Sequence, residues 1–527
     1  MGVDNSPSSV PLPGLVMIQI DGLSLSQLEA ALSRGRLPFI RSLVLDHAYH
    51  LMPLYAGVPS TTPAVQAEIF FGVKAAVPAF EFIDRRYQKR RVMFNADSAA
   101  RVAAELEASG HAPLLQNGTS YSNIFAGGAA EARYCAETIR LESLLQSLNP
   151  LKFILLMLLH IVKVLRVLGV SLLELAIAVK DFFKGVMTGK NFVKELKFIP
   201  SRVFICIVLR ELIRFRVKMD MARGVPIIHA NFTGYDEQAH RRGPASGFAH
   251  WTLKGIDWVV GDIYRAAGRS EKRNYGFMFY ADHGQESVRI YGDNNDRDVK
   301  HAVKTVYDAL IHSALHPSHA GRGKTSEYLH VDAKSFWTGI HCAGRHNRLD
   351  NDECFTNDLI VTTMGPLGHV YLPEPLDPPE LAVFARQLVD KADIPLVLYK
   401  IDQADGVIAV NRHGEFELKK KPAAVLGSDH PFLRQAIEDL SALCFHPHAG
   451  DVIISGWSTD GQPLTFSIEN GAHGGPGSEE TRGFALLPRT VRNKKNYVRP
   501  LDLRTAAFSL LKGTDQAIKT ERKNSAE

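Results

Sequence analysis

The sequence predicts an α/β fold, a three-layer α/β/α sandwich with a mostly parallel central sheet and a helical insertion. Short apolar runs that end in Asp and Gly alternate along the chain with stretches of helical periodicity. At 527 residues the chain is long enough for one large α/β domain with insertions, or for two or three domains. One segment, residues 146–222, breaks the alternation and defines the insertion.

The first strand is predicted in the run GLVMIQIDG at 14–22, which ends in Asp-Gly as buried parallel strands do. A helix is predicted directly behind it in LSQLEAALSRG, ended by Gly35. The same pattern recurs in GVPIIHANFTGYD at 224–236, YGFMFYADHG at 275–284 and DVIISGW at 451–457. Because ligands bind at the carboxyl ends of such strands, the acidic and histidine residues there are the site candidates.

A helix start is predicted in GVPSTTPAVQAEIFFG at 57–72. Ser60, Thr61 or Thr62 can cap this helix, and Pro63 suits its first turn. The free N–H groups and the positive dipole end also form an anion site, where a threonine hydroxyl would meet a phosphate. An alcohol is a weak nucleophile unless a base or a metal lowers its pKa. The stretch alone therefore fits either a cap or a nucleophile.

Two basic and apolar runs fill residues 148–220. On one helix, the polar residues from Lys152 to Lys184 fall within a stripe of roughly 160°, opposite Leu, Ile, Val and Phe. Charges recur too often for a transmembrane span, and the pattern is typical of an amphipathic helix in a bilayer interface. An anionic membrane surface is therefore the partner predicted for 150–218. A cap packed on the enzyme or on a second subunit, and a helix that binds another partner, stay open.

Composition and charge argue against several classes of protein. The formal charge of +5 is small for this length, so binding to nucleic-acid duplexes is not expected. The five cysteines are scattered without a CxxC pair, which indicates neither a disulfide framework nor a zinc ribbon. The N-terminal residues lack the features of a signal peptide. We therefore expect a cytoplasmic protein that can lie peripherally on the inner face of the membrane.

Six residues at strand ends or beside glycines form a common ligand set. Each is weak evidence alone, because a strand-end aspartate is often a helix cap and a lone histidine is often structural. Together they offer the oxygen and nitrogen atoms that suit two zinc-like ions. Two such ions about 4 Å apart can stabilise both oxygens of an in-line phosphoryl displacement. The set consists of Asp21, Asp236, His240, Asp282, His283 and His473.

The order Asp-Gly, Pro-Ser-x-Thr, Asp-x-x-x-His, Asp-His-Gly, His-Gly resembles the alkaline phosphatase superfamily, above all its type I phosphodiesterase/nucleotide pyrophosphatase branch. The motifs run from residue 20 to residue 485 and so cover most of the chain. The resemblance implies that Thr62 is the nucleophile, with Thr61 as the nearby alternative. It implies that one metal is held by Asp236, His240 and His473. It implies that the other is held by Asp21, Thr62, Asp282 and His283.

The resemblance also implies a two-step reaction with two divalent metal ions, Zn²⁺ by preference and Mn²⁺ as the alternative. The Thr62 alkoxide would attack phosphorus to give a phosphothreonine, which water then hydrolyses. The sequence departs from the branch in one respect. The asparagine that usually contacts the phosphoryl oxygens has no equivalent in FFGVKAAVPAFEFIDRRYQ at 70–88. The Cys/Ser-x-Pro-x-Arg signature of sulfatases is absent at the nucleophile, which disfavours sulfate ester hydrolysis.

Four further residues are candidates for substrate binding. Arg85 and Arg86 belong to a basic cluster that can bind an anion, although a solvated surface hairpin is equally basic. Ser120 and His369 lie in glycine-rich stretches, 117–129 and 364–372, of the kind that line pockets. Glycine-rich turns without a binding role have the same composition.

The predicted function is hydrolysis of a phosphodiester or pyrophosphate, either a small molecule or a membrane-proximal, lipid-linked substrate. The alternatives are a phosphomonoesterase or phosphotransferase of the same superfamily, a non-catalytic membrane-associated protein that binds metal or phosphate, and a scaffold that acts through its insertion. Four regions are predicted: core 1–145, insertion 146–222, core 223–515 and a disordered tail 516–527.

Overall fold

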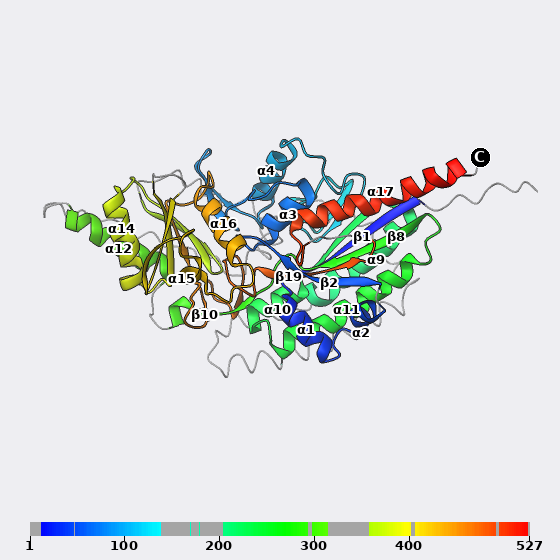
Figure 1. Ribbon diagram of the computed structural model, residues 1–527, viewed down its shortest axis with the longest axis horizontal. Helices are drawn as coiled ribbons and strands as arrows, with labels where there is room; N and C mark the ends of the chain where they lie inside the picture. The colour runs from blue at the N-terminus through cyan, green and yellow to red at the C-terminus, as the bar shows by residue number, and fades with distance from the viewer. Residues whose placement is uncertain are drawn as a thin grey trace, which may run out of the picture.

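Two β-sheets with helices on their faces make up the computed structural model (Figure 1). The structure describes residues 12–46, 48–138, 204–293, 298–314, 358–401, 406–491 and 495–524, together with the single residues 169 and 179. The seven-stranded main sheet has Asp21 and Asp282 just beyond the ends of its strands. A second, six-stranded sheet lies at the other end of the molecule, on the left in Figure 1.

The main sheet has seven strands in the order β2-β19-β8-β1-β7-β5-β6. They are β1 (Leu12–Ile20), β2 (Tyr49–Tyr55), β5 (Thr119–Tyr121), β6 (Glu131–Arg133), β7 (Ile227–Phe232), β8 (Arg273–Tyr280) and β19 (Arg482–Pro488). All neighbours pair in parallel except β19, which is antiparallel to β2 and β8. Gln19 pairs with both Asn231 and Tyr280, so β1, β7 and β8 end at the same edge.

Helices cover both faces of the main sheet, which confirms the predicted three-layer architecture (Figure 1). One layer contains α1 (Leu25–Ser33), α2 (Pro38–Leu45), α9 (Arg210–Arg223), α10 (Gly234–Arg242) and α11 (Gly247–Ala267). The other contains α3 (Thr62–Phe71), α4 (Ala96–Glu107) and α17 (Pro500–Asn524). Val16 and Ile18 of β1 are buried in the first core, and Leu15 and Met17 in the second, as strand alternation requires.

The second sheet has six strands in the order β11-β12-β16-β13-β14-β15, and its neighbours are antiparallel. They are β11 (Ile360–Met364), β12 (Leu367–Tyr371), β13 (Leu396–Ile401), β14 (Gly406–Asn411), β15 (Gly414–Glu417) and β16 (Val452–Ser455). The core on one face includes residues of α12 (Val299–Ala314) and α14 (Pro378–Ala392). The core on the other includes residues of α15 (Pro422–Leu426) and α16 (Leu433–Cys444).

This second sheet corrects the interpretation of 451–457 as part of the parallel alternation. The run forms β16, a central strand of the antiparallel sheet. A strand covered on both faces is apolar throughout, so its sequence is the same in a parallel or an antiparallel sheet.

Three short strand pairs complete the described structure. They are the hairpin β3 (Glu81–Asp84) with β4 (Lys89–Val92), the pair β9 (Glu286–Ser287) with β18 (Gly471–Ala472), and the pair β10 (Arg289–Ile290) with β17 (Leu464–Thr465). Short helical turns are η1 (Ala136–Thr138), η2 (Phe204–Leu209) and η3 (Tyr291–Asp293). The β9–β18 and β10–β17 pairs lie along the chain between the two sheets.

Most of the predicted insertion, and most of 150–218, lies outside the described residues. Its last part forms η2 and α9, where Ile213 and Val217 are buried in the core of the main domain. These residues are four apart and therefore share one helix face. Within the described part of the chain, no helix is long and apolar enough to cross a membrane.

The C-terminal region also differs from the prediction. α17 continues to Asn524, into the range 516–527 predicted to be disordered. The residues from 514 on contain neither Gly nor Pro, so nothing in them ends the helix.

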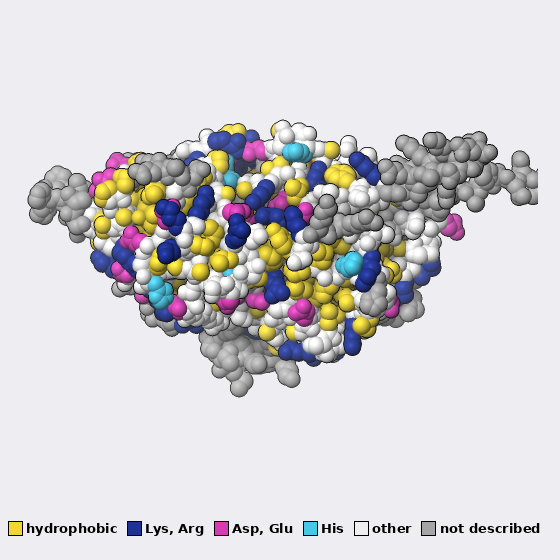
Figure 2. All heavy atoms as spheres, viewed as in Figure 1, with side chains coloured by type: hydrophobic (Ala, Val, Ile, Leu, Met, Phe, Trp, Pro, Cys, Tyr) yellow, Lys and Arg dark blue, Asp and Glu magenta, His cyan; other side chains and the backbone are white. Residues whose placement is uncertain are grey.

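Figure 2 shows how charge is distributed over one face of the molecule. Lys and Arg side chains there lie among Asp and Glu side chains instead of gathering in a single basic field. This arrangement agrees with the small formal charge of +5.

Candidate metal centre and nucleophile

Three carboxylates meet at the shared carboxyl edge of β1, β7 and β8. Asp21 directly follows β1, Asp282 follows β8, and Asp236 lies in the first turn of α10 after β7. Gly22 has a φ of 70°, and a Cβ placed there would come within 2.3 Å of Oδ1 of Asp236. Glycine at this turn therefore allows the end of β1 to approach the start of α10.

Asp21, Asp282 and His283 form the first candidate metal group. Each offers one ligand atom, and these atoms lie within 4.8 Å of one another. Nε2 of His283 lies 3.6 Å from Oδ1 of Asp21 and 3.4 Å from Oδ2 of Asp282. Nδ1 of His283 lies 2.9 Å from the Gly284 carbonyl, which can only accept, so Nδ1 carries the proton. Nε2 is therefore the nitrogen that faces the two carboxylates.

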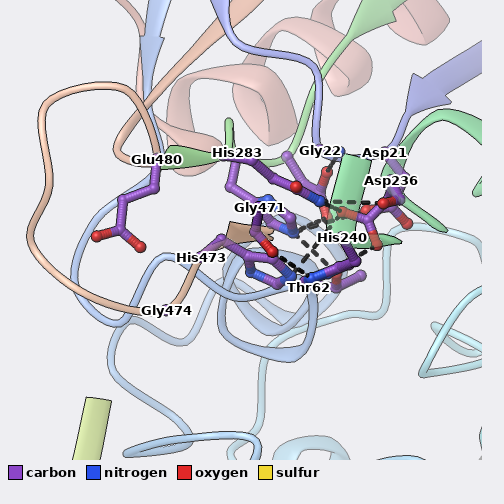
Figure 3. A network of polar contacts seen from close by, with 12 residues as sticks. Asp21, Gly22, Thr62, Asp236, His240, His283, Gly471, His473, Gly474 and Glu480 are labelled. Carbon is purple, nitrogen blue, oxygen red and sulfur yellow. Dashed lines mark hydrogen bonds and ion pairs between the residues drawn. The ribbon is translucent and has the colours of Figure 1, made fainter. Parts of the chain in front are cut away.

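Asp236, His283 and His473 form the second candidate group, so His283 belongs to both (Figure 3). Nε2 of His473 lies 3.9 Å from Oδ1 of Asp236. Its Nδ1–H donates to the Ser60 carbonyl at 2.9 Å, which leaves Nε2 as the ligand atom. The rings of His283 and His473 are stacked, with centroids 3.7 Å apart.

His240 lies beside the second group. Its Nε2 is 3.3 Å from Oδ2 of Asp236, on the same helix and one turn earlier. Its Nδ1 is 2.8 Å from Oε2 of Glu469 and 2.9 Å from the Gly471 carbonyl. The structure thus brings all six predicted ligands together, but it groups His283 with Asp236 and His473 where the resemblance implied His240. Glu469 was not predicted, because no local pattern connects it with His240.

The electrostatics of the cluster favour a bound cation. Burial raises the pKa of Asp21 well above its ordinary value, and the nearby carboxylates of Asp282 and Asp236 raise it further. Oδ1 of Asp21 and Oδ2 of Asp282 are buried without a hydrogen-bond partner in the described structure. Buried carboxylate oxygens without donors are costly, and a divalent cation between them would remove both the repulsion and the missing contacts. The residues present therefore fit metal binding.

Burial and the neighbouring charges also change the pKa values of His240 and His473. Burial lowers the pKa of His240, but the carboxylates of Asp236 and Glu469 outweigh it and hold this pKa well above its ordinary value. Burial lowers the pKa of His473, and the neighbouring His283 lowers it further. At neutral pH His473 is therefore in the neutral form that binds metals.

Thr62 is the first residue of α3, and its side chain is buried against the first group. Its Oγ1 lies 3.2 Å from Nε2 of His283 (Figure 3). Thr61 is the N-cap, but its hydroxyl makes no capping bond and has no partner in the described structure. Pro63 lies in the first turn, and the helix ends at Gly72 in the left-handed conformation. Of the two threonines, Thr62 is the one in contact with a candidate metal ligand.

A buried amide network behind α3 supports the position of Thr62. Gln66, one turn after Thr62, donates to Oε1 of Gln19 at 3.3 Å and to Oδ1 of Asn123 at 3.0 Å. Its own Oε1 accepts the backbone N–H of Ile124 at 2.9 Å. The network connects the helix of Thr62 with the strand that precedes Asp21. Sequence patterns did not reveal it, because its members come from separate segments.

The structure places the four substrate-binding candidates outside these groups. Arg85 pairs with Asp451 at 2.9 Å, and Arg86 pairs with Glu105. His369 is buried on β12, where its Nε2 lies 3.3 Å from the Pro78 carbonyl and its Nδ1 accepts from Gly450. Ser120 is buried on β5 and accepts a hydrogen bond from Asn123 at 2.7 Å.

The stretch 70–88, which lacks the expected asparagine, approaches the site with an aromatic side chain. The ring of Phe80 meets the ring of His473 edge-on, with centroids 5.8 Å apart. Its other contact is a stacked arrangement with Phe94 at 4.9 Å. An apolar surface thus lies beside this candidate ligand.

No protein-family model matches the chain, and no curated protein matches it. Among solved structures, the chain is similar to phosphonoacetate hydrolase from Sinorhizobium meliloti 1021 in complex with phosphonoformate. The sequence identity is 12%, the match covers 97% of this chain and 98% of that chain, and the TM-score is 0.47. It is also similar to murine ectonucleotide pyrophosphatase/phosphodiesterase 5, an inactive form in complex with AMP, with 10% identity, 95% of each chain covered, and a TM-score of 0.44. The human form of that protein gives 10% identity, 94% coverage of each chain, and a TM-score of 0.46.

Proposed function

We propose that this chain is a metal-dependent phosphoric ester hydrolase of the alkaline phosphatase superfamily, similar to its type I phosphodiesterase/nucleotide pyrophosphatase branch. Its nucleophile is Thr62. The observation that carries the proposal is the distance of 3.2 Å between Oγ1 of Thr62 and Nε2 of His283. His283 belongs to both candidate metal groups, which supports a cation beside this hydroxyl.

Two divalent ions fit the donor set. Asp21, Asp282 and His283 would hold one ion. Asp236 and His473, with His240 beside them, would hold the other. Carboxylate and imidazole donors favour Zn²⁺, with Mn²⁺ as the alternative. When bound, such ions supply Lewis-acid chemistry that lowers the pKa of a hydroxyl and stabilises negative charge on phosphoryl oxygens.

The reaction proceeds in two displacements at phosphorus. The Thr62 hydroxyl gives up its proton, Oγ1 forms a bond to phosphorus, and the bond from phosphorus to the leaving oxygen breaks. The products are a phosphothreonine and a leaving group, which takes up the released proton through the solvent. Water then attacks the same phosphorus, the Oγ1–P bond breaks, and Thr62 regains its hydroxyl proton. The first N–H groups of α3 have no acceptor within the helix and can hold the non-bridging oxygens. Burial of Thr62 limits the access of bulk water during the first step.

The substrate in this proposal is a phosphodiester or a pyrophosphate. The apolar ring of Phe80 beside His473 supports a substrate with an organic group next to phosphorus. The amphipathic pattern of 150–218 supports a membrane-proximal or lipid-linked ester, and this part of the proposal depends on the sequence pattern alone.

The test of the nucleophile compares two substrates and three proteins. Metal-loaded wild type, Thr62→Ala and Thr61→Ala are assayed with bis(p-nitrophenyl) phosphate and with p-nitrophenyl phosphate. We expect wild type to prefer the diester and Thr62→Ala to lose roughly a thousandfold or more in kcat, as nucleophile substitutions do. Thr61→Ala serves as the matched control, because its hydroxyl has no partner in the described structure.

Three outcomes would count against the proposal. Turnover that survives in Thr62→Ala and is lost in Thr61→Ala would move the nucleophile by one residue. A preference for the monoester would favour a phosphomonoesterase. A wild-type protein with two bound ions that cleaves neither ester would contradict this hydrolase activity.

The proposal of a membrane-proximal substrate has its own test. The protein is floated with vesicles of phosphatidylcholine alone and with vesicles that contain phosphatidylglycerol. We expect binding to the anionic vesicles that weakens as salt increases, because surface attraction is screened. A protein that floats with neither kind of vesicle would remove the support for a lipid-linked substrate and would leave the hydrolase proposal untouched.

A further inference from the structure

Glu480 contacts three of the segments that carry candidate site residues. Its side chain is only 1% exposed. Oε2 accepts the N–H of Gly475 at 2.8 Å and lies 3.2 Å from the Ser60 hydroxyl, while Oε1 accepts the N–H of Gly477 at 2.8 Å. Its backbone carbonyl accepts the N–H of Gly284 at 2.9 Å. One residue thus joins the Thr62 turn, the loop after His473 and the turn after His283.

Ser60 completes the connection on the nucleophile side. Its hydroxyl accepts the N–H of Gly474 at 2.9 Å, and its one proton faces two acceptors, the Gly475 carbonyl at 2.9 Å and Oε2 of Glu480 at 3.2 Å. Its carbonyl accepts the Nδ1 proton of His473 at 2.9 Å. Since that bond determines which nitrogen of His473 is free, the turn that carries Thr62 also determines the ligand atom of His473.

The glycines in HGGPGSEE make room for this arrangement. A Cβ at Gly475 would lie 2.8 Å from Oε1 of Glu480. A Cβ at Gly477 would lie 2.7 Å from the same oxygen and 2.6 Å from Oε1 of Glu286. The backbone can therefore approach the buried carboxylates only where side chains are absent. In Figure 3, Glu480 lies beside the loop of His473 and Gly474, away from the cluster around Thr62.

We propose that Glu480 is a positioning residue that holds Nε2 of His473 and Oγ1 of Thr62 in their mutual arrangement. It acts through the Ser60 hydroxyl and the backbone N–H groups of Gly475 and Gly477. It belongs to neither candidate metal group. The inference rests on the proposed function, and it identifies the residue that couples the nucleophile turn to a metal ligand.

The role requires two accepting oxygens on one side chain. Both oxygens of Glu480 accept a backbone N–H, one from Gly475 and the other from Gly477. Glutamine has nearly the same volume but only one accepting oxygen, so its NH₂ group must face one of these two donors. Glu480→Gln therefore removes hydrogen bonds without leaving a cavity.

Glu68→Gln is the matched control. Glu68 is also buried, at 5% exposure, and accepts the backbone N–H of Leu501 at 3.2 Å. It lies on the same helix as Thr62, six residues later, near the other end of α3. The same substitution at this position disturbs a buried carboxylate without reaching the candidate site.

The experiment measures zinc affinity by chelator competition, the melting temperature of the metal-free protein, and kcat and KM for bis(p-nitrophenyl) phosphate at saturating zinc. We expect Glu480→Gln to bind zinc about 10–100-fold more weakly, as changes to residues behind metal ligands typically do. We expect kcat to fall while KM stays nearly constant, because the displaced groups are the nucleophile and a ligand. Glu68→Gln should change the melting temperature and leave zinc affinity and kcat unchanged.

Two outcomes overturn the inference: unchanged zinc affinity and kcat in Glu480→Gln, or equal losses in Glu68→Gln. If Glu480→Gln does not fold, Ser60→Ala replaces it and should show the same loss of zinc affinity. Turnover that survives in Thr62→Ala overturns the proposed function instead. In that case, a loss of zinc affinity confined to Glu480→Gln still supports the positioning of His473.

Discussion

Gly22 lies so close to Asp236 that a side chain at position 22 would not fit. A Cβ added to Gly22 would lie 2.3 Å from Oδ1 of Asp236 and 3.1 Å from its Cβ. Asp236 is a member of the second candidate metal group, and Gly22 directly follows Asp21 of the first. The two groups are therefore held together by backbone contact as well as by the shared His283.

Gly22→Ala should disrupt both metal groups. The added methyl group must displace Asp236 or the turn after β1, so we expect both ions to bind at least about tenfold more weakly. Metal content after dialysis, measured by elemental analysis, tests this expectation.

Gly35→Ala is the control for this substitution. Gly35 also has a positive φ, 63°, but a Cβ there would meet nothing within 4 Å. Both variants carry the backbone strain of about 1–2 kcal/mol, whereas only Gly22→Ala adds the clash. Equal metal loss in the two variants would show that the contact with Asp236 is irrelevant.

Glu469→Ala should weaken binding at the second group. Glu469 accepts from Nδ1 of His240 at 2.8 Å and from the Thr465 hydroxyl. Its removal leaves the Gly471 carbonyl as the remaining acceptor for His240. We therefore expect a loss near the low end of the usual range, about tenfold in affinity for one ion and little change for the other. Isothermal titration with zinc separates the two sites.

Glu415→Ala provides the reference for Glu469→Ala. Glu415 is exposed on β15 of the second sheet, so its removal should leave both affinities unchanged. A Glu469→Ala protein that binds both ions like the reference would disprove the role assigned to Glu469.

The metal-free protein should lose stability as pH rises from about 5 to 8. Burial, and then repulsion by Glu286, raises the pKa of Glu480 to about 8. Burial likewise raises the pKa of Glu286 to about 7. Both pKa values exceed the ordinary glutamate pKa of the unfolded chain, so the folded state binds more protons in this window. Each group then lowers the free energy of unfolding by about 1.4 kcal/mol per pH unit, until its folded pKa is passed.

Urea unfolding of chelator-treated protein across this pH window measures the slope. Glu480→Gln removes one titrating group, so its stability should fall less steeply than that of wild type. Glu415→Ala, which removes an exposed carboxylate, is the control for this slope. Parallel slopes for wild type and Glu480→Gln would show that Glu480 does not titrate in this range.

The sequence was most informative for candidate metal ligands that directly follow a recognisable strand or begin a recognisable helix. Asp21 and Asp282 each follow an apolar run, and the parallel register of β1 with β8 brings them to one edge. The helix start at Thr62 followed from the nearby proline and from Gly72. Secondary structure, the sheet edge and the members of the ligand cluster could therefore be predicted from short stretches.

Residues that act through distant partners could not be predicted. Glu469 and Glu480 lie in polar stretches without periodicity, and their roles depend on His240 and Ser60, which are more than two hundred residues earlier. The antiparallel order of the second sheet depends on strand pairing, which a single strand does not reveal. The ion pair of Arg85 with Asp451 could not be predicted either, because Asp451 comes from another part of the chain.

The location of Glu469 between β17 and β18 has a spectroscopic consequence. β17 pairs with β10, and β18 pairs with β9. Glu469 therefore lies between two short strand pairs, in the segment that follows the second sheet. A displacement of β16 or β17 would change the hydrogen bond at Nδ1 of His240. The imidazole resonances of this histidine would therefore report, from a residue beside the main sheet, on events that begin in the other sheet.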